Sequence, residues 1–264
     1  MRRWLPACAG LLLLTSCTWT PPWHAEPEVR VSGTQLADRY RLEQERRRQG
    51  PSLWGMEGIL DLETPDQARR NRIDMVGSGA LRIRMRAYGP FHQIAMELLV
   101  GTEWIRLVDP GRKTITQVPA NAAGMEHLIG LPLPPEHLHR LLMGWAAEVR
   151  QPEGVMLGGS SASGIEVVAG DGERLRLEPV TGRILERSGE VGEGRRYQAA
   201  YVWPEGGGEA MPERILVTLD RPAARMEVIR KRWFQPKTGP DPRWFEEEPP
   251  VGFELRHPLD GGDP

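Results

Sequence analysis

Few side chains in this sequence have the type and spacing that catalysis or metal binding requires. His137 and His139 lie two residues apart, so they would point to different faces of a helix, and no zinc-type spacing accompanies them. The segment 158–164 contains serines but lacks the order of a nucleophile elbow and the lysine of a P-loop. We therefore expect no catalytic residue, no metal site and no bound cofactor; a hydrolase is a distant alternative.

Cys17 carries a different chemistry. It ends the segment Leu14-Thr15-Ser16-Cys17, which is similar to a bacterial lipobox. A short apolar stretch precedes this segment, and two arginines precede that stretch. That stretch is too short to cross roughly 30 Å of hydrocarbon. We predict that residues 1–16 are a lipoprotein signal peptide, that Cys17 carries diacylglycerol and an N-acyl chain, and that residues 17–33 are a lipid-anchored tether. An ordinary signal peptide with a coincidental cysteine is the alternative.

The composition indicates a soluble globular body. The chain has 264 residues, of which 27% are charged, and a net charge of −2, which gives no basis for a nucleic-acid partner. The mean hydropathy of −0.45 excludes a multi-span membrane protein. Both cysteines lie within the first 17 residues, so the predicted body contains no disulfide.

The pattern of apolar residues predicts a mainly β body. A helix is expected over residues 34–49, with a charged and solvated run at 43–48. Alternation predicts strands from residue 54 onward, interrupted by two short helices at 121–129 and 135–143. No crossover helices separate the strands, so we expect an incomplete antiparallel β-barrel of about 11–12 strands with a short helical lid. This domain spans 34–234, and residues 235–264 form a Pro-rich acidic extension with a last strand at 253–255.

A sheet of this length must curl, and its concave side needs a cover or a ligand. We interpret the apolar residues of that side as the lining of an acyl-chain cavity, because two short helices would not fill a half-barrel. The alternative is a packed core: a cavity open to solvent favours lipid binding, and a filled interior favours the core. The predicted lining residues are Ile83, Met85, Met96, Leu98, Ile105, Leu107, Leu138, Leu141, Leu142, Val217, Leu219, Met226 and Val228.

Several segments resemble LolB, the outer-membrane receptor of bacterial lipoprotein localisation, and its LolB-like relatives. The lipobox at Cys17 is shared, and an ordered match follows over residues 54–233: the connection Tyr88-Gly-Pro-Phe91, the helical segment 129–144, and the segment 210–213 before two strands that Trp233 closes. The resemblance implies a LolA/LolB-like half-barrel with a helical lid and an acyl-chain cavity. Such a receptor takes a lipoprotein from the periplasmic carrier LolA and inserts it into the outer membrane.

The same resemblance implies a membrane-contact loop made of Phe91, Pro90 and Tyr88, because a protruding apolar residue at the matching place serves membrane insertion in LolB. From the residues alone, Phe91 folding back onto the sheet edge is the alternative. Thr18, by resemblance to Gram-negative lipoproteins, favours release to the outer membrane.

We therefore expect a monomer anchored in the outer membrane and facing the periplasm. Its expected partners are a LolA-like carrier, lipoprotein acyl chains and the inner leaflet of the outer membrane. A structural or RseB-like sensor lipoprotein with a packed core and no lipid transfer is the alternative function.

Overall fold

The computed structural model describes residues 29–49, 52–78, 82–147, 149–150, 156–159, 163–192, 194–205, 211–238 and 252–257. The helices are α1 (Gly33–Arg48), α2 (Ala122–Ile129) and α3 (Pro135–Met143). The strands before the two short helices are β1 (Val29–Ser32), β2 (Leu53–Thr64), β3 (Gln67–Ser78), β4 (Arg82–Tyr88), β5 (Ile94–Val100), β6 (Trp104–Asp109) and β7 (Thr114–Pro119). The strands after them are β8 (Val149–Arg150), β9 (Met156–Gly159), β10 (Ile165–Ala169), β11 (Arg174–Leu177), β12 (Ile184–Val191), β13 (Arg195–Val202), β14 (Arg214–Asp220), β15 (Ala223–Phe234) and β16 (Glu254–Arg256).

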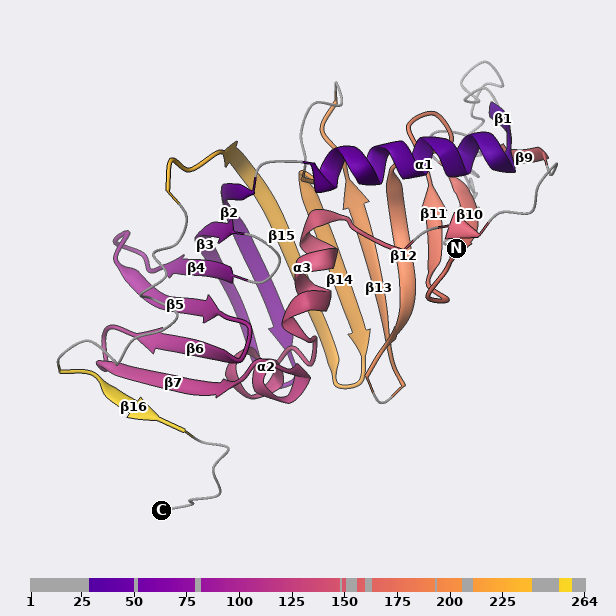
Figure 1. The fold of residues 1–264 in the computed structure, drawn as a ribbon. Coiled ribbons are helices and arrows are strands. Elements are labelled where there is room, and N and C mark those ends of the chain that lie inside the picture. The colour runs from indigo at the N-terminus through magenta and orange to yellow at the C-terminus, as the bar shows by residue number, and fades with distance from the viewer. Residues whose placement is uncertain are drawn as a thin grey trace, which may run out of the picture.

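Two antiparallel meanders form one open sheet of 14 strands (Figure 1). The first meander runs from β2 to β7 and the second from β10 to β15, and they join where β2 pairs with β15. The strand order begins at β16 and ends at β8, so among the described strands the sheet does not close. The predicted incomplete antiparallel barrel is confirmed, with more strands than the roughly 11–12 expected.

Strand alternation decides which face of the sheet is buried. In β10, Ile165 and Val167 are buried while Glu166 and Val168 are exposed, and β13 and β14 repeat the pattern. Because successive side chains point to opposite faces, the buried members of neighbouring strands gather on the inner face. The helices cover that face.

The helices begin and end at residues suited to those places. The Ser32 hydroxyl accepts a hydrogen bond of 3.1 Å from the Gln35 amide, and the Gln35 side chain accepts one from the Ser32 amide, which completes a capping box. Gly130 and Gly144 end α2 and α3 with φ angles of 73° and 63°, which glycine adopts without steric cost. The predicted helix boundaries are therefore correct to within a residue or two.

The short helices belong to the connection between the two meanders. They follow β7 and precede β8 in the chain, and α3 lies over the inner face near β15 and β14 (Figure 1). Helix α1 crosses the second meander (Figure 1). Leu138, Leu141 and Leu142 of α3 belong to the buried cluster that fills the inner face.

Some pairing between distant segments was not predicted. β1 pairs with β9 in a separate two-stranded sheet, so residues 29–32, expected as part of the tether 17–33, form a strand instead. β9 also overlaps the predicted turn at 158–164. β16 forms close to the strand expected at 253–255, and it pairs with β7 in parallel. Such pairings depend on partners far away in the chain and leave little local pattern.

Candidate functional site

An apolar cavity lies between α3 and the inner face of the sheet, close to the junction of the two meanders. Register brings its walls together, because Met85 pairs with Met75 on one side and Leu98 on the other, and Met226 pairs with Leu62. Every lining residue is apolar: Leu60, Leu62, Met75, Ile83, Met85, Leu98, Val100, Ile129, Leu138, Leu142, Met226 and Val228.

The structure brings together seven of the predicted lining residues: Ile83, Met85, Leu98, Leu138, Leu142, Met226 and Val228. Four others are buried in the core away from the cavity: Ile105, Leu141, Val217 and Leu219. Leu107 is partly buried against that core. Met96 lies outside the lining, with its sulfur 3.4 Å from Nη1 of Arg69.

Sequence reasoning missed five lining residues: Leu60, Leu62, Met75, Val100 and Ile129. The signal for most of them was present. Leu60 and Leu62 alternate along β2 as the predicted residues do along β4, and Val100 continues the alternation of Leu98. Ile129 is the last residue of α2. It reaches the cavity because of the way the segment between α2 and α3 folds, which no strand alternation predicts.

The cavity is nearly filled. Its volume is about 40 Å³. Pockets that hold small molecules measure roughly 300–1,000 Å³. An acyl chain can therefore enter only if α3 moves away from the sheet, and in the described conformation the interior is that of a packed core.

The chain that follows α3, residues 144–147, is held by hydrogen bonds to its backbone. The Gln44 side chain on α1 donates to the carbonyl of residue 144 and accepts from the amide of residue 146, both at 3.2 Å. The Tyr40 hydroxyl donates to the carbonyl of residue 147 at 2.6 Å, and Arg187 donates to that of residue 145 at 2.5 Å. The C-terminal end of α3 is therefore fastened by polar contacts, while Leu138 and Leu142 hold its body by apolar packing.

A buried ion pair supports this fastening. The Arg187 side chain is 0% exposed, and its guanidinium donates to both carboxylate oxygens of Glu173. The Tyr197 hydroxyl donates to Glu173 and accepts from Nε of Arg187 at 3.1 Å. Burial favours the neutral form of Tyr197 and raises the pKa of its hydroxyl. One guanidinium, one carboxylate and one phenol thus form a mutually hydrogen-bonded group, and Arg187 links it to the carbonyl of residue 145.

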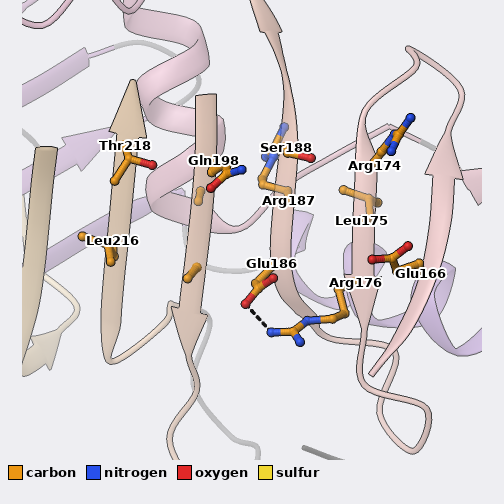
Figure 2. A pocket seen from close by; sticks show the side chains of 12 residues that line it. Glu166, Arg174, Leu175, Arg176, Glu186, Arg187, Ser188, Gln198, Leu216 and Thr218 are labelled. Carbon is orange, nitrogen blue, oxygen red and sulfur yellow. Dashed lines mark hydrogen bonds and ion pairs between the residues drawn. The ribbon is translucent and has the colours of Figure 1, made fainter. Parts of the chain in front are cut away.

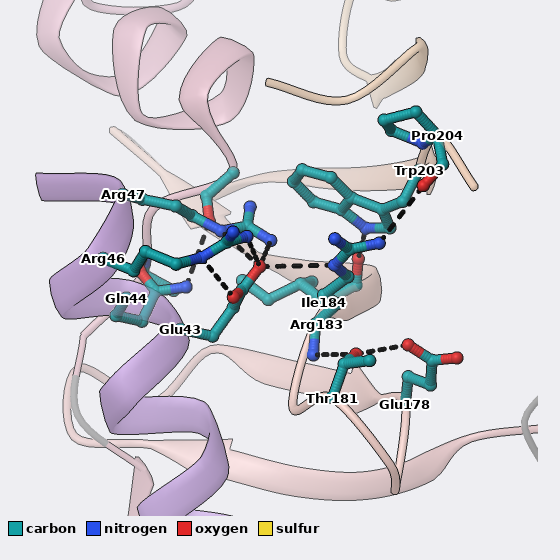
Figure 3. Close-up of polar contacts among 12 residues, drawn as sticks. Glu43, Gln44, Arg46, Arg47, Glu178, Thr181, Arg183, Ile184, Trp203 and Pro204 are labelled. Atoms are coloured by element: carbon teal, nitrogen blue, oxygen red, sulfur yellow. Dashed lines mark hydrogen bonds and ion pairs between the residues drawn. The ribbon is translucent and has the colours of Figure 1, made fainter. Parts of the chain in front are cut away.

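A second buried network fixes α1 on the sheet (Figure 3). Glu43 Oε1 accepts from Arg47 at 2.6 Å and from Arg183 of the second meander at 3.3 Å. The Arg47 guanidinium lies 3.7 Å from the ring centroid of Trp203. Burial alone would raise the pKa of Glu43, but hydrogen bonds from Arg46 and Arg47 outweigh it and lower the pKa. The prediction that residues 43–48 are a solvated run is therefore wrong for Glu43, Gln44 and Arg47, which are buried.

The two histidines of α3 are neutral and face different neighbours. His137 meets the ring of Tyr197 edge-on, with centroids 4.7 Å apart, and His139 meets Trp145 edge-on at 5.0 Å. Burial lowers the pKa of each imidazole to about 4. Within the described ranges no group of three His, Cys, Asp or Glu side chains could hold a metal ion.

The outer face of the second meander carries a shallow hollow of about 390 Å³ (Figure 2). Small side chains such as Ser188 and Ala200 form its floor, and Glu186 pairs with Arg176 at its rim. The exposed charges of this hollow are solvated and worth little to stability. It lies on the opposite side of the sheet from the apolar cavity.

The β4–β5 hairpin holds the predicted membrane-contact residues. Phe91 is 88% exposed, so it projects into solvent and does not fold back onto the sheet edge. Pro90 beside it is also exposed. Tyr88 is half-buried at the end of β4, where its hydroxyl donates to Oδ2 of Asp74 at 2.6 Å. The exposed tip is therefore formed by Pro90 and Phe91, without Tyr88.

The predicted signal peptide and Cys17 lie outside the described residues. Of the helices that the structure describes, none is long and apolar enough to span a membrane.

No family model matches this chain, and no curated protein matches it significantly. Solved structures do. A Vibrio parahaemolyticus domain described as an outer membrane lipoprotein-sorting protein has a TM-score of 0.50 at 11% identity, over 80% of this chain and 97% of its own. A DUF1329 family protein from Desulfovibrio piger has a TM-score of 0.50 at 11% identity, over 81% and 95%. A LolA superfamily protein from Nitrosomonas europaea has a TM-score of 0.48 at 10% identity, over 81% and 97%. The chain therefore shares the fold of the first two structures, and at such identity the likeness concerns the fold alone.

Proposed function

We propose that this protein is an outer-membrane lipoprotein that takes up lipoprotein acyl chains beneath α3. In this proposal it is a monomer that catalyses no reaction, receives lipoproteins from a periplasmic LolA-like carrier and inserts them into the inner leaflet of the outer membrane. The observation that carries the proposal is the wholly apolar set of side chains that α3 covers on the inner face of an open sheet. The fold shared with the Vibrio parahaemolyticus domain supports it, because that domain is described as an outer membrane lipoprotein-sorting protein.

The proposal requires α3 to open. Uncovering its three buried leucines, Leu138, Leu141 and Leu142, costs roughly 1.5–3 kcal/mol each, and burying one methylene group returns about 0.8 kcal/mol. An acyl chain that buries ten methylenes therefore gains about 8 kcal/mol, which is comparable with the cost of exposing the three leucines. Because hydrogen bonds hold residues 144–147, the end of α3 nearer α2 is the one expected to lift.

A sensor lipoprotein with a packed core is the second candidate. The observation that favours it is the cavity volume of only about 40 Å³. The two candidates differ in one measurable property, because only the transfer protein binds a free acyl chain.

The anchor is tested by Cys17→Ala. If Cys17 is acylated, the variant is expected to lose incorporation of labelled palmitate and to fractionate with soluble periplasmic proteins, because no acyl chain then holds it at the membrane. Cys8→Ala is the matched control, since Cys8 lies within the predicted signal peptide and is removed with it. Unchanged labelling of the Cys17 variant would contradict the anchor.

The membrane contact is tested by Phe91→Glu. Burial of a Phe side chain in lipid is worth roughly 1.5–3 kcal/mol, enough to favour docking but not to anchor. The variant is expected to fold and to bind an acyl probe normally, yet to transfer bound lipoprotein to liposomes more slowly. Leu42→Glu, at another exposed apolar residue that is 67% accessible on α1, should transfer normally. Normal transfer by the Phe91 variant would exclude this residue from membrane contact.

A further inference from the structure

A small recess lies on the outer face of the first meander, directly behind the β4–β5 hairpin. Its volume is about 210 Å³, and it is lined by Glu57, Arg72, Ile73, Asp74, Tyr88 and His92. We call it the hairpin recess. Register places Glu57 opposite Asp74 and Arg72 opposite Tyr88 on adjacent strands. His92 follows Phe91 in the turn, so the exposed tip and the recess share one hairpin.

The recess carries charges of both signs. Glu57 accepts a hydrogen bond from Arg232 and lies 4.0 Å from Nη2 of Arg72. Asp74 accepts one hydrogen bond from the Tyr88 hydroxyl, and a carboxylate can accept several more. The Arg72 side chain is 57% exposed, which leaves N–H groups accessible to a ligand. Two carboxylates, one guanidinium and one imidazole line the recess, and this mixed set suits a zwitterion better than a free anion or a free cation.

We propose that the hairpin recess binds the phosphoethanolamine headgroup of a phospholipid while Phe91 enters the hydrocarbon. This inference rests on the proposed membrane contact and names its lipid. The ammonium group, with three N–H donors, is held by the carboxylates of Asp74 and Glu57, and the phosphate is held by Arg72 and His92. A choline headgroup lacks those N–H donors. A purely anionic headgroup has no ammonium group to neutralise the two carboxylates of the recess.

The recess adjoins the exposed tip of the hairpin. Tyr88, at the end of β4, and His92 both line it, and Phe91 lies between them in a turn that the hydrogen bond from the His92 amide to the carbonyl of residue 89 closes. Apolar side chains at a membrane surface are buried roughly 5–10 Å into the boundary between headgroups and acyl chains. With Phe91 in that boundary, the adjoining recess faces the headgroups.

Vesicle flotation of the full chain carrying Cys17→Ala tests the inference without a contribution from the anchor. Replacing half of the phosphatidylcholine by phosphatidylethanolamine is expected to strengthen binding roughly tenfold, as expected for charge-assisted hydrogen bonds. Asp74→Asn, which keeps an acceptor for Tyr88, and Arg72→Gln should each return binding to the level of pure phosphatidylcholine. Asp61→Asn is the control, because Asp61 lies on the same sheet face but pairs with Arg70 at 3.6 Å outside the recess.

Soluble O-phosphoethanolamine should compete with the vesicles and phosphocholine should not, which separates headgroup binding from a general effect on the bilayer. Equal binding to both vesicle types, or an Asp74→Asn variant that keeps the preference, overturns the inference. If Asp74→Asn fails to fold, Arg72→Gln decides, since its side chain is largely exposed. Phe91→Glu should weaken binding to both vesicle types. If Phe91→Glu weakens binding while the wild type shows no lipid preference, the membrane contact stands and the headgroup site is wrong. If Phe91→Glu changes binding to neither vesicle type, the membrane contact is wrong and the inference fails with it.

Discussion

Met85→Glu is expected to abolish binding of a fluorescent fatty acid to the full chain carrying Cys17→Ala. The parent chain should bind the probe with a Kd near 1 µM or tighter, about −8 kcal/mol. Met85 lines the apolar cavity between Met75 and Leu98. A carboxylate placed there without a partner is costly to bury, and it occupies the space that the acyl chain requires. The measurement is a fluorescence titration, with the unfolding midpoint of each variant recorded beside it.

Met96→Glu is the matched control for this experiment. Met96 lies on the neighbouring strand β5 but outside the cavity, with its sulfur beside Arg69, so the new carboxylate has a cation to pair with. This variant should bind the probe as the parent chain does. Loss of binding in both variants would show that the acyl chain of the probe lies along the whole inner face of the sheet. If the parent chain shows no saturable binding at about 100 µM probe, near −5.5 kcal/mol, the interior is a packed core and the sensor candidate is favoured.

Glu173→Gln is expected to lower the free energy of unfolding by about 3–5 kcal/mol, because it leaves the guanidinium of Arg187 buried without its counter-charge. The Arg187 side chain is 0% exposed, and the substitution preserves volume, so the loss reflects charge and not packing. Urea unfolding followed by circular dichroism measures the difference.

Glu186→Gln is the matched control for the ion pair. Glu186 pairs with Arg176 on the outer face, where the two side chains are 51% and 32% exposed. Removal of a pair in contact with solvent should cost about 0–1 kcal/mol. Equal losses in the two variants would show that the buried position of Arg187 adds nothing to its pairing with Glu173.

The sequence predicted the strands and the helices well because both leave local patterns. Ile83, Met85 and the arginines between them alternate as a half-buried strand requires, and Gly144 ends α3 as glycine commonly ends helices. The strands β1 and β9 left no such pattern. Their pairing joins residues 29–32 to residues 156–159, and short strands acquire their stability from the partner.

The cavity residues were predicted only in part, for a reason that Met96 illustrates. Alternation correctly assigns Met96 to the inner face, since it pairs with Ala87 in a register shared by Met85 and Leu98. Whether an inner-face residue lines the cavity depends on where α3 crosses the sheet, and Met96 lies towards the hairpin, away from α3. Ile129 lies at the cavity because of the same chain path.

The sequence by itself determined that the chain is mainly β, that its two short helices lie between two groups of strands, and that the side chains of its strands alternate between an inner and an outer face. Those properties follow from local periodicity and from turn and cap residues. Only the tertiary structure decided that Glu43 and Arg187 are buried, because their partners Arg183 and Glu173 come from distant positions in the chain. It also decided that the volume of the cavity is only about 40 Å³. That volume is the small difference between the space a curled sheet encloses and the volume of the side chains that fill it, and no local pattern contains such a difference.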